Sequence, residues 1–158
     1  MPFLGRALPL RVESAQIKRV RRPVFEEGAL NLLVPAELAP DARTEFIQRC
    51  LRLWYRPRAE KRLRETAFEL AGTTGRAPAA VKVKDLRSSW GICRGDNISL
   101  NWRLVMAPLE LIEYVVYHEL CHLEHRGHGQ DFWRALSEFV PDYKDRRRAL
   151  RDIDLDWI

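Results

Sequence analysis

The four histidines of this sequence all lie in one short segment, between His118 and His128. His118 and His122 enclose Glu119 in the pattern HExxH. On a helix, residues four apart lie on the same face, so two imidazoles at this spacing can bind one metal ion. Glu119 lies one position off that face, where it can reach a metal-bound water but is badly placed to be a ligand. The spacing therefore predicts a zinc-dependent hydrolase.

A catalytic zinc takes three protein ligands and keeps a fourth position open for water. His125 would continue along the same helical face, which would set the ligands almost in a row. Gly127 can adopt the left-handed conformation that ends helices, and this would let His128 approach from another direction. A distant carboxylate such as Glu138 is a weaker alternative. The predicted ligands of one zinc ion are therefore His118, His122 and His128, and His125 is expected to support a ligand or to face solvent.

The predicted chemistry is hydrolysis by a zinc-bound water that Glu119 activates. Zinc lowers the pKa of its bound water to about 7, and Glu119 would take the proton and return it to the leaving group. Four side chains are candidates for stabilising the developing oxyanion, although each is more often a packing or surface residue. They are Tyr114, Tyr117, Tyr143 and Arg126.

The element that must position these residues is a helix beginning near Pro108 and running to about Arg126. One stripe of it is apolar, while the histidines lie nearly opposite, so one face can be buried while the other faces a cleft. The apolar stripe consists of Leu109, Ile112, Val116, Leu120 and Leu123.

A strand with alternating character precedes this helix, at residues 97–102. Its polar positions are candidate substrate-binding residues, namely Asn97, Ser99 and Asn101. If the strand lies at a sheet edge beside the cleft, its backbone could pair with an extended peptide. The equally favoured alternative is a core strand with one solvated face.

The rest of the chain predicts one α+β domain over residues 1–158. Residues 1–36 are β-rich, with a turn at residues 26–28, and residues 41–72 are helical. Pro57 should break or kink that stretch, giving two helices. Residues 80–128 hold a β-hairpin and the active-site helix, and residues 130–152 form two further helices separated by Pro141.

Composition predicts a soluble cytoplasmic protein. The three cysteines are odd in number and form no CxxC pair, which argues against a disulfide framework. The sequence has no secretory signal and no apolar run of the roughly 18 residues that a membrane helix needs. The net charge of +5 gathers in clusters at residues 18–22, 56–64 and 146–148. Solvated surface is the favoured interpretation, and attraction for a polyanion is the alternative.

Five blocks together resemble the YgjP-like metallopeptidases, which are relatives of the SprT-like and WLM zinc peptidases. They are SWGIC at 89–93, NISLNWRL at 97–104, HELCHL at 118–123, His128 with Phe132-Trp133, and PDY at 141–143. The resemblance implies a zincin-like fold, with a small mixed or antiparallel sheet, a backing helix, and an active-site helix carrying HExxH. It also places His128 at the position of the family's third ligand.

The resemblance implies a metallopeptidase whose substrate is a peptide or an unfolded protein. Some YgjP-like proteins are described as UTP pyrophosphatases, so a nucleotide substrate at the same metal site is the alternative. A third hypothesis is a nucleic-acid-associated zinc module with little activity. Ser89 and Ile92 stand where the family usually has Arg and Ser, and both lie near the expected cleft.

Overall fold

The computed structural model describes residues 1–17 and 19–153. Lys18 of the first basic cluster and residues 154–158 of the predicted domain lie outside the described residues. The strands are β1 (Pro2–Phe3), β2 (Arg6–Ala7), β3 (Leu10–Ala15), β4 (Val24–Glu26), β5 (Ala29–Pro35), β6 (Ala80–Lys84), β7 (Gly91–Arg94) and β8 (Asn97–Asn101). The helices are α1 (Pro40–Thr74), the 3-10 helix η1 (Trp102–Met106), α2 (Leu109–Cys121), α3 (Gln130–Phe139) and α4 (Tyr143–Arg151). The α+β class and the two C-terminal helices are confirmed.

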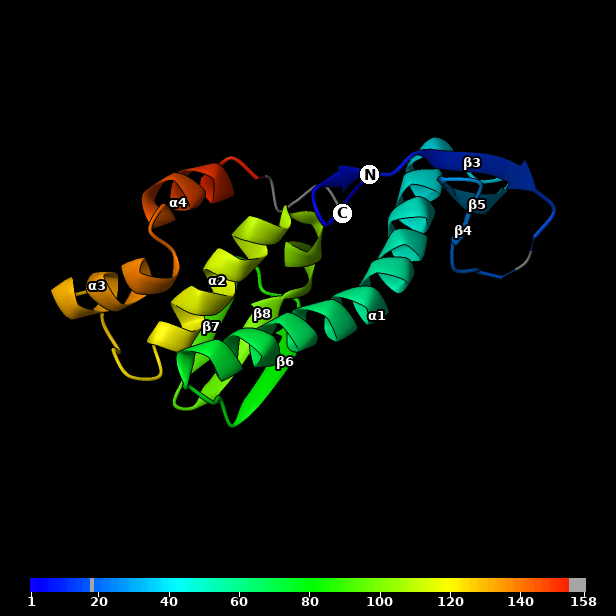
Figure 1. Ribbon diagram of the computed structural model, residues 1–158. Helices are drawn as coiled ribbons and strands as arrows, with labels where there is room; N and C mark the ends of the chain where they lie inside the picture. The colour runs from blue at the N-terminus through cyan, green and yellow to red at the C-terminus, as the bar shows by residue number, and fades with distance from the viewer. Residues whose placement is uncertain (18, 154–158) are drawn as a thin grey trace.

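The sheet that supports the histidine helix has the strand order β6-β8-β7. Strand β8 is parallel to β6 and antiparallel to β7. Helices α1 and α2 pack against each other and against this sheet (Figure 1). Ile98 and Leu100 of β8 are fully buried beneath them. Their burial follows from the alternation of the strand, since every second side chain points to the helix-covered face.

Of the two alternatives for the strand at 97–102, the position at a sheet edge is excluded, because β8 has a neighbour on both sides. Asn97 is exposed and Ser99 half-buried, but Asn101 is completely buried. Its amide donates to the carbonyls of Leu86, at 2.8 Å, and Ser89, at 3.1 Å. Its side-chain oxygen accepts from the first turn of η1. Asn101 therefore anchors a loop and a helix start, and the edge strands of this sheet are β6 and β7.

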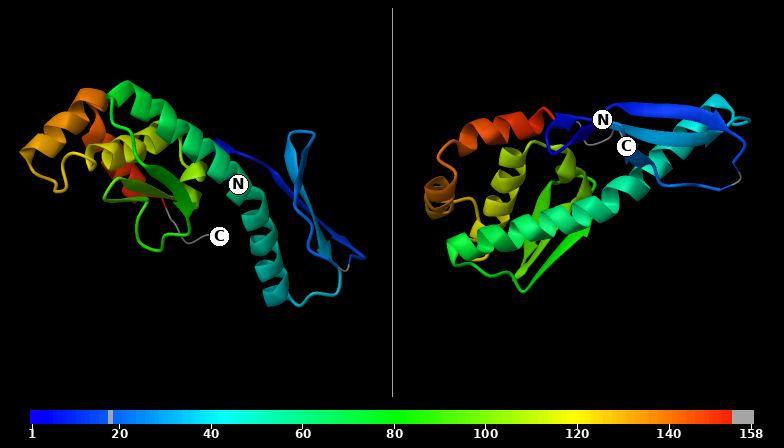
Figure 2. Two further views of the ribbon diagram at one scale, coloured as in Figure 1. Left: turned by 90° about the horizontal axis from the view of Figure 1, so that it is seen from below. Right: turned by 45° about the vertical axis from the view of Figure 1, so that its right-hand side comes forward.

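The prediction of two separate helices is wrong, whereas the alternative of a kink agrees with the structure. Helix α1 runs through Pro57, its central residue, and bends near the middle of its length (Figure 2). A proline inside a helix removes one hydrogen bond and bends the axis. The helix continues because Trp54, Tyr55 and Ala59, on both sides of the proline, are buried in the core.

A second sheet, with strand order β3-β5-β4, covers the first part of α1 at the end of the molecule away from α3 and α4 (Figure 1). Its small core contains Leu32, Val34 and Cys50. The predicted turn before β5 is confirmed, with Glu27 and Gly28 both in the left-handed region. Among the described residues, no helix has the length and hydrophobicity that crossing a membrane requires.

Candidate metal centre

Helix α2 presents His118 and Glu119 from a scaffold anchored by its opposite face. Ile112, Val116 and Leu120 on that face are fully buried. The predicted continuation of the helix to about Arg126 is wrong, because α2 ends at Cys121. The chain then turns, and the backbone N–H of His125 donates to the carbonyl of Cys121 at 2.9 Å.

The predicted left-handed bend at Gly127 is wrong as well. Gly127 is absent from the glycines of positive φ, which in the described residues are Gly5, Gly28, Gly75 and Gly95. The change of direction begins earlier, in the turn at residues 122–124. His128 is held from the other side of the loop, since the indole N–H of Trp133 on α3 donates to the His128 carbonyl at 2.9 Å.

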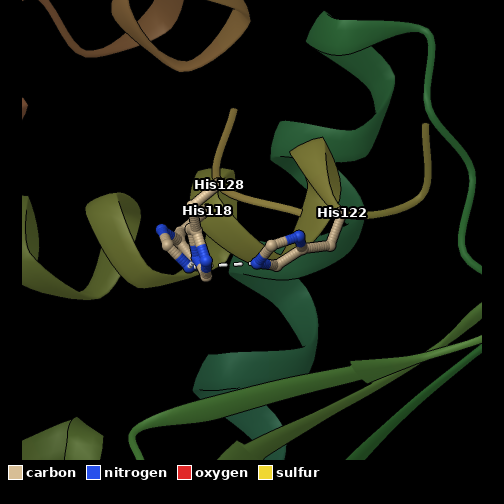
Figure 3. A group of neighbouring side chains, drawn as sticks. All are labelled: His118, His122 and His128. Atoms are coloured by element: carbon tan, nitrogen blue, oxygen red, sulfur yellow. Dashed lines mark hydrogen bonds between the residues drawn. The ribbon is translucent and has the colours of Figure 1, made fainter. Parts of the chain in front are cut away.

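The side chains of His118, His122 and His128 converge, with their ring nitrogens directed toward one another (Figure 3). The Nε2 atom of His118 lies 3.2 Å from that of His122 and 3.1 Å from that of His128. Zinc–nitrogen bonds of about 2.0–2.1 Å at tetrahedral angles would set such nitrogens roughly 3.3–3.4 Å apart. Two of the three separations are thus close to this value, and all three ligand atoms lie within 4.8 Å of one another, so these residues can hold one metal ion. The exposed side chain of Glu138 is not part of this group.

The backbone of His125 fixes the ring of His122. The Nδ1 atom of His122 lies 2.8 Å from the His125 carbonyl oxygen. A carbonyl only accepts, so Nδ1 must carry the proton and Nε2 must offer its lone pair to the metal position. His125 thus contributes through its carbonyl, a role that depends on no side-chain chemistry and that the residue type did not reveal.

Phe132 on α3 packs against all three imidazoles. Its ring centroid lies 4.9 Å from that of His118, 4.5 Å from that of His122 and 4.8 Å from that of His128. The side chain is only 1% exposed. Phe132 therefore forms a rigid apolar support on which the three rings rest.

Burial lowers the pKa of His118 to about 3, and the neighbouring charges of His122, His128 and Arg147 lower it further. The pKa of His128 is lowered as well, mainly by burial and in addition by repulsion from His122 and Arg147. Both rings are therefore neutral at physiological pH, which is the protonation state that binds a metal.

Glu119 is a buried carboxyl beside this group, 5% exposed. Burial raises its pKa from 4.5 to about 7, and the backbone N–H of Cys93 on β7 donates to the carboxylate and opposes part of that rise. A carboxyl with a pKa near neutrality can both take up and release a proton at physiological pH.

An open cleft of about 480 Å³ lies over the histidines. One wall is the edge strand β7 with the turn after it, and the other is α2 with the segment that follows. The lining residues are Gly91, Ile92, Cys93, Gly95, His118, Glu119, His122, Arg126 and His128. Sequence reasoning assigned no role to Cys93, which now proves to line the cleft.

Of the four candidates for oxyanion stabilisation, Arg126 alone lines this cleft. Tyr114 is buried with its ring 6.0 Å from that of His118. Tyr117 stacks on Phe139, and Tyr143 stacks on Trp133. The three tyrosines are thus held in ring packing around the site, and the arginine is the cation at its rim.

Comparison with known proteins agrees with this geometry. Residues 1–153 match the family described as YgjP-like, metallopeptidase domain, so the chain belongs to that family. The crystal structure of the metallopeptidase zymogen of Pyrococcus abyssi abylysin is similar in fold, with a TM-score of 0.51 and 20% sequence identity. That similarity covers 56% of this chain and 90% of the abylysin chain. A comparison with curated proteins gives no match.

Proposed function

We propose that this member of the YgjP-like family is a zinc-dependent metallopeptidase with a zincin-like arrangement of its site. His118, His122 and His128 would hold one zinc ion, and Glu119 would be the catalytic base. The observation that carries the proposal is the convergence of the three imidazoles, with the Nε2 atoms of His122 and His128 at 3.2 and 3.1 Å from that of His118, beside a buried carboxyl whose pKa is about 7.

A bound zinc ion would supply Lewis-acid polarisation of the attacked carbonyl and would make water more acidic. The protein's part is proton transfer. At neutral pH a large fraction of Glu119 is ionised, so a carboxylate oxygen can accept a proton from the attacking water. The protonated carboxyl can then donate to the leaving amine. The Cys93 N–H orients the carboxylate throughout.

The peptide would lie along β7, since this strand is the sheet edge that borders the cleft. An exposed strand edge offers backbone groups to an extended chain irrespective of its sequence. The peptide-pairing role considered for Asn97, Ser99 and Asn101 therefore moves to β7, apart from the Cys93 N–H, which Glu119 already engages. The family's description as a peptidase domain favours a peptide over the nucleotide and nucleic-acid alternatives. The cytoplasmic location stays a prediction.

The test is a substrate panel of unfolded protein, folded protein and nucleoside triphosphates, given to the zinc-loaded enzyme. We expect cleavage of the unfolded protein. The Glu119→Gln variant should keep its zinc and lose activity by about 10²–10⁴-fold, the usual contribution of general acid–base catalysis. Glu110→Gln makes the same change at an exposed position of the same helix and serves as the control. Turnover of nucleotides alone, or undiminished cleavage by Glu119→Gln, would overturn the proposal.

A further inference from the structure

Gly91, the first residue of β7, lies directly against the side chain of Glu119. A Cβ atom placed on Gly91 would lie 2.6 Å from Oε1 of Glu119, 2.7 Å from its Cγ and 2.9 Å from its Cδ. Carbon atoms pack favourably at about 3.5–4.0 Å. Even the methyl group of alanine therefore has no room at this position while Glu119 keeps its place.

The backbone does not require glycine here. Gly91 is absent from the residues of positive φ, and it pairs with Leu100 in the regular antiparallel register of β7 and β8. Glycine inside a strand is unfavourable, because it loses more conformational freedom on folding than other residues and offers no side chain to pack. The gain from glycine at this position is therefore the space it leaves beside β7.

Glu119 has little freedom to move away from an added methyl group. Its side chain is almost fully buried, and the Cys93 N–H that holds its carboxylate comes from the same strand as Gly91. A displacement that relieved the contact with residue 91 would stretch or break that hydrogen bond.

We propose that Gly91 is a positioning residue for Glu119. The missing side chain at position 91 forms a slot, bounded by β7 and α2, that holds the carboxylate against Cys93 and beside the three histidines. This inference rests on the proposed function, in which Glu119 is the catalytic base. In this proposal the position of the base depends on strand β7, whose Gly91 lies 28 residues before Glu119 in the sequence.

The expected effect follows from the size of the displacement. Moving Oε1 from 2.6 Å to the 3.4 Å at which ordinary contact begins requires roughly 0.8 Å. A misplacement of about 1 Å can reduce catalysis by about 10²-fold. Gly91→Ala should therefore lower kcat by about 10- to 100-fold, with zinc content unchanged and a small change in KM.

Gly127→Ala is the matched control. Gly127 lies between two of the histidines in sequence, has no positive φ, and has no atom within 4 Å of an added Cβ. It should retain wild-type kcat. In the metal-free protein, the amide resonance of Cys93 should shift in Gly91→Ala and stay unchanged in Gly127→Ala, because only the former disturbs the bond to Glu119.

A second measurement tests the slot without using activity. The free energy of unfolding of metal-free protein is measured for Gly91→Ala, for Glu119→Ala and for the double variant. Removing the Glu119 side chain deletes the three atoms that the methyl group would meet. Gly91→Ala should therefore destabilise the wild type strongly and the Glu119→Ala background little. If Gly91→Ala alone fails to fold, the double variant should recover a folded state.

The outcomes separate the two proposals. Coupling between positions 91 and 119 in a protein that cleaves no peptide would support the slot and overturn the proposed function. Peptide cleavage that Gly91→Ala leaves at the level of Gly127→Ala, together with additive unfolding energies, would overturn the slot and keep the proposed function.

Discussion

The support that Phe132 gives to the three imidazoles leads to a prediction about metal affinity. Phe132→Ala removes a buried ring whose centroid lies within 4.9 Å of each imidazole centroid. The space cannot be refilled by the histidine rings without turning their Nε2 atoms away from one another. The variant should therefore lose stability and lose the preformed geometry of the site together.

Two magnitudes follow from this packing. Truncating a fully buried phenylalanine to alanine costs roughly 3–5 kcal/mol of unfolding free energy. Loss of the groups that orient metal ligands typically lowers metal affinity by about 10–100-fold. Phe132→Leu keeps an apolar side chain in the site but not the flat ring face, so it should lie between alanine and the wild type in both measurements.

The assay is urea unfolding of the metal-free variants, combined with zinc affinity from competition with a chelator of known strength. Leu136→Ala is the control, because Leu136 is equally buried on the same helix and its truncation also costs roughly 2–5 kcal/mol. If Phe132→Ala and Leu136→Ala weaken zinc binding equally, the ring does not preform the site, and its effect is only that of general core stability.

Two further predictions concern the histidines and the buried carboxyl. His128→Ala should abolish stoichiometric zinc binding, whereas His125→Ala should retain it because alanine keeps the carbonyl that orients His122. Elemental analysis of the zinc content of both variants checks this. A lower zinc content in His125→Ala than in His128→Ala would contradict the ligand assignment. In metal-free protein, burial raises the pKa of Glu119 from 4.5 in the unfolded chain to about 7, so its favourable contribution is complete below pH 4.5 and is lost as the pH rises through 7. At about 1.4 kcal/mol per pH unit, this loss amounts to about 3 kcal/mol. The Glu119→Gln variant should therefore be more stable than the wild type by that amount above pH 8 and equally stable at pH 4.5. Urea unfolding at the two pH values measures this difference in unfolding free energy. A difference that does not change with pH would contradict the reasoning.

Local periodicity was sufficient to predict the helix that carries His118 and is capped by His122. The spacing of His118 and His122 depends only on helix geometry, and the boundaries of α3 and α4 follow from Pro141 and the apolar pattern around it. The end of α2 was predicted too late, because the apolar stripe continues to Leu123 although the helix stops at Cys121. A pattern of side chains does not reveal where backbone hydrogen bonds change partners.

Non-local pairing could not be predicted in the same way. The alternation in β8 fits a half-buried strand at the edge of a sheet as well as one at its centre. The central position of β8 results from its pairing with β6, and β7 lies between these two strands in the sequence. Pro57 gave a misleading signal for a similar reason. The local cost of a proline in a helix, about 3 kcal/mol, is exceeded here by the burial of the residues on both sides of it.

The residues that sequence reasoning missed share a physical property: each acts through shape or through its backbone. Gly91 contributes the absence of a side chain, Cys93 an N–H, His125 a carbonyl and Phe132 a ring face. Residue types that bring reactive groups are recognisable from their chemistry, but a slot, a backbone donor or a support becomes visible only when strand and helix are brought together. Gly91, Cys93 and Phe132 do lie in the blocks that carry the family resemblance, but the blocks alone assign these residues no role. Because β7 supplies both the slot and the donor, the position of the Glu119 carboxylate depends on the pairing of β7 with β8 as well as on the helix that carries it.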